Sequence, residues 1–148
     1  MSTRSNIGVL NSDGSVDMIY CHWDGYPENN GKILLESYTD LKKIRRLIKL
    51  GNVSSLGPEL GTKHPFDFDY TLGFDSPEYE AFRNQCNFYG RDRGEKGQGP
   101  CHYPNVEQAV EAYRGGWCEF FYLFQNGKWT YMEGKAPFRA LTPARCKA

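Results

Sequence analysis

The sequence predicts a single α+β domain, with an antiparallel β-sheet made of an N-terminal and a C-terminal hairpin and with helices packed on it. Residues 5–10 and 16–21 are short apolar runs on either side of Asp13-Gly14, a dipeptide that suits the positive backbone torsions of a tight hairpin turn. Residues 118–124 are apolar on both faces, as in a covered central strand, and Asn126-Gly127 follows as the second hairpin signal. Apolar residues at helical spacing between the hairpins predict the helices.

The first two helices are expected directly after the N-terminal hairpin. Residues 27–38 begin with Pro-Glu, which suits a first helical turn, and Asp24 is the expected cap. The second helix carries an apolar stripe, is capped by Thr39 or Asp40, and ends at Gly51.

Two more helices are expected further along the chain. Residues 76–78 read Ser-Pro-Glu, a helix start, and Tyr79 and Phe82 are the expected buried face. The fourth helix opens at Pro104, carries an apolar stripe, and ends at residues 115–116.

The remaining segments carry turn and loop signals. Residues 52–75 show no sustained periodicity, which is typical of a functional loop and can conceal a strand. Residues 87–89 predict a short strand, residues 90–99 a flexible polar loop, and the tail after Gly134 an irregular segment. Because no linker or internal repeat divides the chain, residues 1–148 are expected to form one domain.

Composition restricts the function classes. The chain has 18 Lys plus Arg and 18 Asp plus Glu, so its formal net charge is zero and does not attract the whole protein to nucleic acid or to a membrane surface. The charges are segregated, since residues 40–50 are basic and residues 59–80 are acidic. Five cysteines without a Cys-x-x-Cys pair predict thiols. Without an apolar leader or a run of about 18 apolar residues, the expected location is a cytoplasm.

The first candidate site is residues 22–27, where a strand is expected to pass into a helix N-terminus, an arrangement that favours anions. Trp23 or Tyr26 can stack on a base, and Gly25 lets a ligand approach the backbone. This pattern suits a nucleotide or another anionic ligand. In the alternative interpretation Asp24 is a helix cap, Gly25 is a turn residue and Trp23 anchors the core.

The second candidate site is the loop that carries Arg91 and Arg93. Arginine side chains bind phosphate or carboxylate with two hydrogen bonds, and a glycine-rich loop can surround an anion. The phosphate-binding pattern Gly-x-x-x-x-Gly-Lys-Ser/Thr is absent. The alternative is a solvated loop in which these arginines pair with neighbouring acids.

The segregated charges suggest two more surfaces. The basic residues of 40–50 can contact phosphates, and a solvated helix face is the alternative. Residues 59–80 place four aromatic side chains among acids, a pattern that can dock a basic partner protein or imitate nucleic acid. An ordinary loop whose aromatics fill the core is the alternative there.

Catalytic and metal motifs are weak. Cys21-His22 and Cys101-His102 are adjacent pairs, but neighbours on a strand point to opposite faces, so no metal site and no cofactor are predicted. A nucleophilic pair of Cys101 with His22 is recognisable only in space. No serine nucleophile motif or His-Glu-x-x-His motif occurs, and no catalytic residue is predicted.

Four segments carry a resemblance to known proteins: MSTRS at 1–5, YCHWDGYP at 20–27, GNVSSLG at 51–57 and YGRDRG at 89–94. Together they resemble a family of small uncharacterised proteins of bacteriophages and bacterial mobile elements. The resemblance implies a phage-borne accessory protein that acts in the cytoplasm of a bacterial host. Such proteins often block host defences by binding a defence protein or by sequestering a nucleotide signal. The resemblance implies no activity and no catalytic residue.

The sequence and this resemblance together predict a non-enzymatic binding protein that counters a host system. Its partner would be a host protein or a small anionic nucleotide, with no membrane partner. The expected nucleotide pocket is lined by Arg4, His22, Trp23, Asp24, Tyr26, Arg91 and Arg93. One alternative is an enzyme acting on a nucleotide or nucleic acid, with His22 as general base and Asp24 orienting it or holding a metal. The other is a nucleic-acid-binding module that uses residues 40–50. The oligomeric state is left open.

Overall fold

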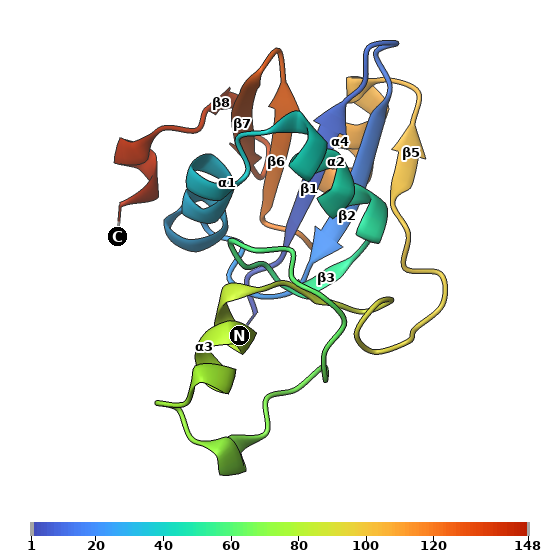
Figure 1. Cartoon of the computed structure of the whole chain (residues 1–148). Coiled ribbons are helices and arrows are strands. Elements are labelled where there is room, and N and C mark those ends of the chain that lie inside the picture. Colours follow the sequence, from blue (N-terminus) through green and yellow to red (C-terminus); the bar gives the residue numbers. More distant parts are fainter. Residues whose placement is uncertain (1, 148) are drawn as a thin grey trace.

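A computed structural model describes residues 2–147, and a mixed β-sheet runs through its centre (Figure 1). Strands β1 (Ser5–Leu10) and β2 (Val16–Cys21) form an antiparallel hairpin in which Ser5 lies opposite Cys21. The turn between them contains Gly14 at φ 89°. The predicted N-terminal hairpin is confirmed, with the predicted bounds.

The C-terminal hairpin is also confirmed. Strands β6 (Phe120–Gln125) and β7 (Lys128–Glu133) are antiparallel, and the turn residues Asn126 and Gly127 have φ of 55° and 75°. Strand β8 (Arg139–Ala140), in the tail expected to be irregular, pairs with β7 at one edge of the sheet. β6 runs parallel to β1, so the sheet is mixed rather than purely antiparallel. The chain crosses over through a helix before it enters β6, and such a crossover allows parallel neighbours.

Three short strands complete the sheet beside β2. Strand β3 (Val53–Ser55) runs parallel to the C-terminal end of β2, and β4 (Asn87–Phe88) pairs with β3 at the other edge. Strand β5 (Cys101–Tyr103) pairs with the N-terminal half of β2. The strand order is therefore β4-β3-β2-β1-β6-β7-β8, with β5 beside β2. β3 lies in the stretch without periodicity, and β5 was not predicted, because three residues show no readable alternation.

Helices cover both faces of the sheet. One π-helical turn, η1 (Pro27–Gly31), continues as α1 (Lys32–Ser37), and α2 (Leu41–Leu50) follows. These helices pack on the face that carries Ile7 and Ile19. Helix α4 (Val106–Arg114) packs on the opposite face, against a cluster that includes Phe121. The same face is called the α4 face below.

The remaining helical elements lie outside these two layers. Helix α3 (Pro77–Asn84) and the short 3-10 helix η2 (Tyr70–Leu72) extend away from the sheet, and η3 (Pro143–Cys146) lies near η1 and α1 (Figure 1). α3 has no buried residue, so Tyr79 and Phe82 are only half-buried.

The helix ends follow the sequence signals with two exceptions, at the starts of the first and fourth helices. α4 begins at Val106 and is capped by Asn105, so Pro104 precedes the helix rather than opening it. Asp40 caps α2 by accepting a hydrogen bond from the backbone N–H of Lys42, and Gly51 ends α2 at φ 93°. The expectation that Asp24 caps the first helix is wrong. Tyr26 occupies the cap position with no side-chain cap, while the Asp24 side chain accepts from the Tyr26 hydroxyl at 3.2 Å. Asp24 stands two residues too early to reach the first free N–H groups.

We expect Gly51→Ala to lower the free energy of unfolding by about 2 kcal/mol or more. The φ of 93° is strained for any side chain, and a Cβ here would lie 2.0 Å from the carbonyl oxygen of Gln98. Chemical denaturation measures the change. Gly99→Ala is the matched control, since a Cβ there meets nothing within 4 Å. Equal stabilities for the two variants would contradict the prediction.

We expect the stability to fall as pH rises above about 10, the usual pKa of tyrosine. Burial raises the pKa of Tyr38 and of Tyr122, whose hydroxyls donate to the carbonyls of Gly57 and Gly25. In the unfolded chain both ionise near the usual value, so each contributes stability that is present below pH 10 and is lost at a rate of about 1.4 kcal/mol per pH unit above it. Denaturation curves from pH 8 to pH 11 measure this slope.

The control for the alkaline slope is a pair of Tyr→Phe variants. Tyr122→Phe should reduce the slope, while Tyr70→Phe, at an exposed position, should leave it unchanged. A slope that is the same in all three proteins would show that buried tyrosines do not cause it.

Candidate functional site

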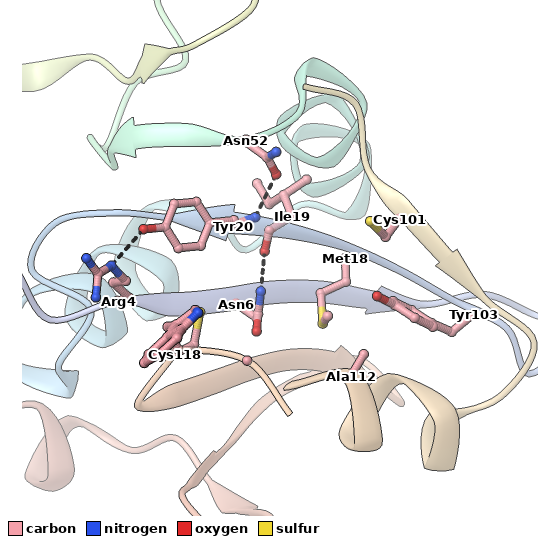
Figure 2. Close-up of a pocket in the computed structure, with 12 residues that line it drawn as sticks. Arg4, Asn6, Met18, Ile19, Tyr20, Asn52, Cys101, Tyr103, Ala112 and Cys118 are labelled. Carbon is pink, nitrogen blue, oxygen red and sulfur yellow. Dashed lines mark hydrogen bonds between the residues drawn. The ribbon is translucent and has the colours of Figure 1, made fainter. Parts of the chain in front are cut away.

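A cavity of about 630 Å³ opens on the α4 face of the sheet (Figure 2). Its floor comes from β1 and β2, one wall from β5, and the other from the end of α4 and the loop that leads to β6. Cavities of this size hold small ligands and cofactors. The lining residues are Arg4, Asn6, Met18, Ile19, Tyr20, Asn52, Cys101, Tyr103, Ala112, Gly116, Trp117 and Cys118.

The cavity exists because α4 covers only part of its face. α4 packs over Val16, Phe121 and Leu123, and its last residue is Arg114. Side chains alternate along a strand, so Arg4 and Asn6 point to the same side. In the β1–β2 register Asn6 lies opposite Tyr20, beyond the end of the helix. Polar groups thus occupy the uncovered part of an otherwise apolar face.

A chain of polar contacts joins Arg4, Tyr20 and His22 at the end of the cavity. Arg4 Nε donates to the Tyr20 hydroxyl at 3.0 Å, and that hydroxyl lies 2.7 Å from His22 Nδ1. One hydroxyl therefore links the Arg4 guanidinium to the His22 ring. Burial raises the pKa of Tyr20, and the Arg4 guanidinium partly offsets this effect.

The electrostatic character of the cavity is positive. The two terminal nitrogens of Arg4 make no hydrogen bond or ion pair within residues 2–147. No carboxylate from the described chain lines the cavity. Arg4 is half-buried, so its charge is less screened than that of a fully exposed arginine. An anion would find an unpaired guanidinium here.

The rim of the cavity carries an aromatic ring that the fold itself does not bury. Trp117 is 86% exposed and follows Gly115 and Gly116, which end α4. A tryptophan this exposed gains little from burial, whereas its flat face is free to stack on a planar ligand.

The side of the cavity is closed by a fixed amide. Asn52 Oδ1 accepts from the Tyr20 backbone N–H at 2.9 Å, and its Nδ2 donates to Gln98 Oε1. Asn6 Nδ2 donates to the Ile19 carbonyl at 3.2 Å. Both amides are held by the backbone, as the dashed lines of Figure 2 show, so the polar floor is arranged before any ligand arrives.

The two thiols of the cavity, Cys118 and Cys101, differ in their environment. Burial raises the pKa of the Cys118 thiol to about 12, so it stays protonated near neutral pH. Cys101 is exposed, but no histidine lines the cavity beside it within the described residues. Among residues 2–147, no group of three or more His, Cys, Asp or Glu side chains is placed to hold a metal ion.

Three of the seven residues expected in the pocket belong to one contact chain. Arg4 and His22 are joined through Tyr20, and the His22 ring meets the Trp23 ring edge-on with centroids 4.7 Å apart. Trp23 is 45% exposed, so the alternative interpretation of it as a core anchor is wrong. Tyr26 is exposed and contacts Asp24.

Trp23 and Asp24 line a second, smaller hollow of about 360 Å³ together with residues of the 55–58 and 82–87 segments. The pairing of His22 with Asp24 that an enzyme interpretation needs is not formed in the described structure. Asp24 bonds to Tyr26, and His22 bonds to Tyr20.

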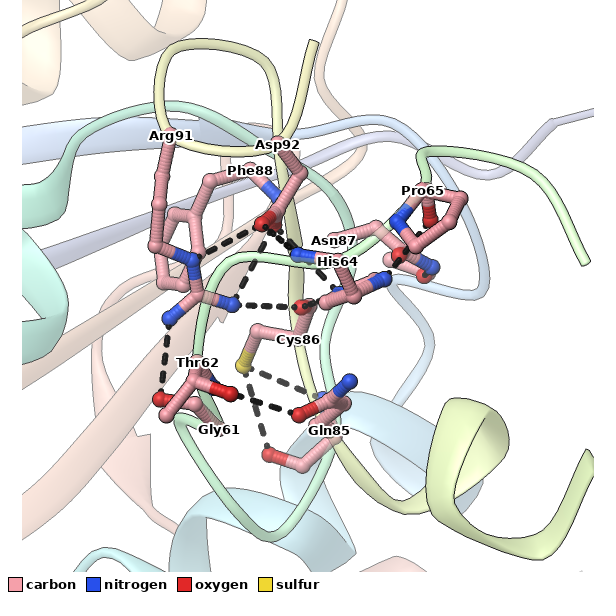
Figure 3. Close-up of polar contacts among 12 residues, drawn as sticks. Gly61, Thr62, His64, Pro65, Gln85, Cys86, Asn87, Phe88, Arg91 and Asp92 are labelled. Atoms are coloured by element: carbon pink, nitrogen blue, oxygen red, sulfur yellow. Dashed lines mark hydrogen bonds and ion pairs between the residues drawn. The ribbon is translucent and has the colours of Figure 1, made fainter. Parts of the chain in front are cut away.

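The structure gives Arg91 and Arg93 contacts within their own region. Arg91 pairs with Asp92 at 2.9 Å, donates to the carbonyls of Gly61 and Cys86, and lies over the Phe88 ring (Figure 3). Arg93 pairs with Glu95 and lies over the Phe66 ring. Neither lines the cavity of Figure 2, and the Arg91 guanidinium is already neutralised by Asp92.

Several lining residues escaped the sequence analysis. Asn6 and Tyr20 stand out as polar side chains within apolar strands, a signal that could have been read from the register of the predicted hairpin. Trp117 stands directly after a helix-ending Gly-Gly pair. Asn52 and Cys101 gave no signal, because they reach the cavity only through the tertiary fold.

Comparison of the chain with protein-family models, with curated proteins and with solved structures gave no match. Within residues 2–147, no helix has the length and apolar character that crossing a membrane requires.

We expect Cys101 to react with a thiol reagent at pH 8 at least about 100-fold faster than Cys118 or Cys21. Cys101 is exposed, whereas burial raises the pKa of both other thiols to about 12 and keeps thiolate scarce. Mass spectrometry of the labelled peptides measures each rate. Cys101→Ser should remove the fast phase. A Cys118 peptide labelled as fast as the Cys101 peptide would contradict the geometry.

Proposed function

We propose that this protein is a non-enzymatic binding protein that sequesters a small anionic ligand with a planar ring, a nucleotide, in the cavity on the α4 face. One observation supports this most directly. The unpaired guanidinium of Arg4 lies in a cavity without lining carboxylates, and the exposed Trp117 stands at its rim. The Arg4 guanidinium suits a phosphate group, and the Trp117 ring suits a nucleotide base.

The remaining lining residues fit the same ligand. Asn6 and Tyr103 offer polar contacts to a base or ribose, and Met18 offers an apolar surface beneath a ring. The protonated Cys118 and the missing His22–Asp24 pair supply no nucleophile or general base, so the proposal assigns no reaction to the site.

The proposed biological role comes from the phage resemblance. A phage-borne protein in a bacterial cytoplasm that removes a nucleotide signal would prevent the host defence from responding to that signal. The role rests on the binding proposal, which can be tested by itself.

The exposed basic side chains of α2 support a second candidate, a nucleic-acid-binding module. Lys42, Arg45, Arg46 and Lys49 all face solvent. Arg45 donates to Asn11 Oδ1, which leaves three of the four side chains without a protein partner in the described chain. Such a surface predicts affinity that falls steeply as salt concentration rises.

We expect calorimetric titration with a panel of mono-, di- and triphosphate nucleotides and cyclic nucleotides to find at least one that binds. Arg4→Gln should weaken this binding by about tenfold or more, because a hydrogen bond to a charged group is lost. Trp117→Ala should weaken it by a similar factor through lost stacking. A bound nucleotide should also slow the labelling of Cys101, which lines the same cavity.

Arg46→Gln is the matched control, because it removes an arginine charge from α2, outside the cavity. It should leave nucleotide affinity unchanged. Binding that Arg46→Gln weakens and Arg4→Gln does not would favour the nucleic-acid candidate. Native mass spectrometry of protein purified gently from bacterial cells adds an independent readout. The proposal would be overturned if native mass spectrometry found no bound nucleotide and calorimetry detected no binding by any nucleotide of the panel.

A further inference from the structure

The backbone of residues 64–85 projects from the sheet (Figure 1). Aromatic side chains of this segment pack on one another. Phe68 is its centre, since it is 7% exposed and its ring contacts four other rings. The partners are Tyr70, Phe74, Tyr79 and Phe82, with centroid distances from 4.9 to 6.4 Å. We call this unit the aromatic lobe. The sequence alternative, in which these aromatics fill the main core, is wrong for Tyr70 and Phe74.

The outer surface of the aromatic lobe is apolar to an unusual degree. Tyr70 is 68% exposed, Phe74 62% and Leu72 50%. These three residues lie within five positions of each other and form a contiguous segment around η2. Exposed apolar patches of this kind mark interaction sites.

The aromatic lobe contains a pocket between its η2 segment and helix α3. The pocket has a volume of about 290 Å³, with Phe68, Leu72 and Phe82 among its walls. Ala81 adds a small side chain that leaves the space open. The volume suits one or two apolar side chains of a partner, which is how an interface anchor is usually held.

The rim of this pocket is acidic. Asp67, Asp69 and Glu78 line it, and none of them has an ion-pair partner within the described chain. Residues 64–85 hold five acidic side chains, one arginine, Arg83, and one histidine, His64. Arg83 lies over the Tyr79 ring, 6.0 Å from its centroid. The surface therefore combines an apolar pocket with unpaired negative charge.

The base of the aromatic lobe is held firmly to the rest of the protein. The side chain of Asp92 is fully buried, and it accepts from the backbone N–H of His64 and from Arg91 (Figure 3). His64 Nε2 lies 3.1 Å from the Cys86 carbonyl, and Gln85 accepts from the Thr62 N–H. A partner would thus meet a surface that is already arranged, which lowers the entropic cost of binding.

We propose that the aromatic lobe is a docking site for a basic segment of a partner protein. The segment inserts one apolar side chain between Leu72 and Phe82, and its lysines or arginines pair with Asp67, Asp69 and Glu78. Apolar insertion supplies the affinity, and charge complementarity supplies the orientation and the speed of association. This site is independent of the nucleotide cavity.

The test uses three synthetic octapeptides on the isotopically labelled full chain, followed by NMR. KRKLLKRK carries the apolar anchor and positive charge, KRKSSKRK carries only the positive charge, and EDELLEDE carries the anchor with the charge reversed. The first should bind and shift the resonances of Leu72, Phe82 and their neighbours, and each control peptide should bind at least about tenfold more weakly. Equal binding of KRKLLKRK and KRKSSKRK would overturn the pocket's role, and so would shifts confined to other elements.

Two charge reversals at equivalent positions test the protein side. Glu78 and Glu107 each lie in the first turn of an exposed helix end, α3 and α4. Glu78→Lys should weaken binding of KRKLLKRK by about tenfold or more, and Glu107→Lys should leave it unchanged. Leu72→Ser, at a half-exposed side chain, should weaken it without unfolding the chain. Equal effects of the two Glu→Lys variants would overturn the proposal.

A second copy of this chain is the competing occupant, because α2 offers exposed basic residues beside the exposed Leu41. Analytical ultracentrifugation distinguishes the two. Self-association that Glu78→Lys abolishes and Glu107→Lys preserves would assign the surface to a second copy and overturn the proposal. A chain that stays monomeric at the peptide-binding concentrations supports it.

Discussion

The rest of the structure depends on the packing of β1 in the middle of the sheet. β1 pairs with β2 along one edge and with β6 along the other, and Ile7 and Val9 are fully buried beneath α1 and α2. On the α4 face Gly8 has no side chain, and a Cβ there would lie 3.2 Å from both Asp17 O and Phe121 Cε1. The absent side chain lets Phe121 lie against the strand, so the sheet and the α4 layer come together at this point.

The cavity is a consequence of where that packing stops. Two residues before Gly8, the face carries Asn6 opposite Tyr20, and α4 has already ended. Covering this polar part of the sheet with an apolar helix would leave Asn6 Oδ1 and the terminal nitrogens of Arg4 without water, at a cost of about 1–3 kcal/mol for each unsatisfied group. An open cavity avoids that cost. It also keeps Arg4, the residue that precedes β1, accessible to an anion.

The aromatic lobe is built by a different principle. It gains stability from local caps, with Asp69 accepting from the Thr71 N–H and Ser76 from the Tyr79 N–H, and from rings that pack on Phe68. The aromatic lobe is joined to the rest of the protein by the polar network of His64, Arg91 and Asp92 rather than by buried apolar contacts to the sheet. The arginine that sequence reasoning assigned to a ligand therefore holds this base in place. The two proposed binding surfaces are therefore separate: one lies on the α4 face of the sheet and the other on the aromatic lobe, and they share no lining residue.

The sequence alone determined the local elements. Gly14 and the Asn126-Gly127 pair specified the two hairpins, because each turn requires positive φ at these residues. Asp40 and Gly51 specified the ends of α2, because capping depends on the few groups next to the helix. The short strands β3, β5 and β8 were harder to find, since two or three residues carry no periodicity and form only when a long strand offers its edge.

Only the tertiary structure decided which functional residues meet. Arg4 and Tyr20 are 16 positions apart, and Cys101 and Trp117 reach the same cavity through a crossover helix and an edge strand. The tertiary structure likewise determines that Arg91 pairs with Asp92 and not with a ligand, because an arginine pairs with the acceptor that the fold places nearest to it. Local structure depends on neighbours along the chain, which a sequence displays directly. A site depends on neighbours in space, which the parallel pairing of β1 with β6 and the end point of α4 determine.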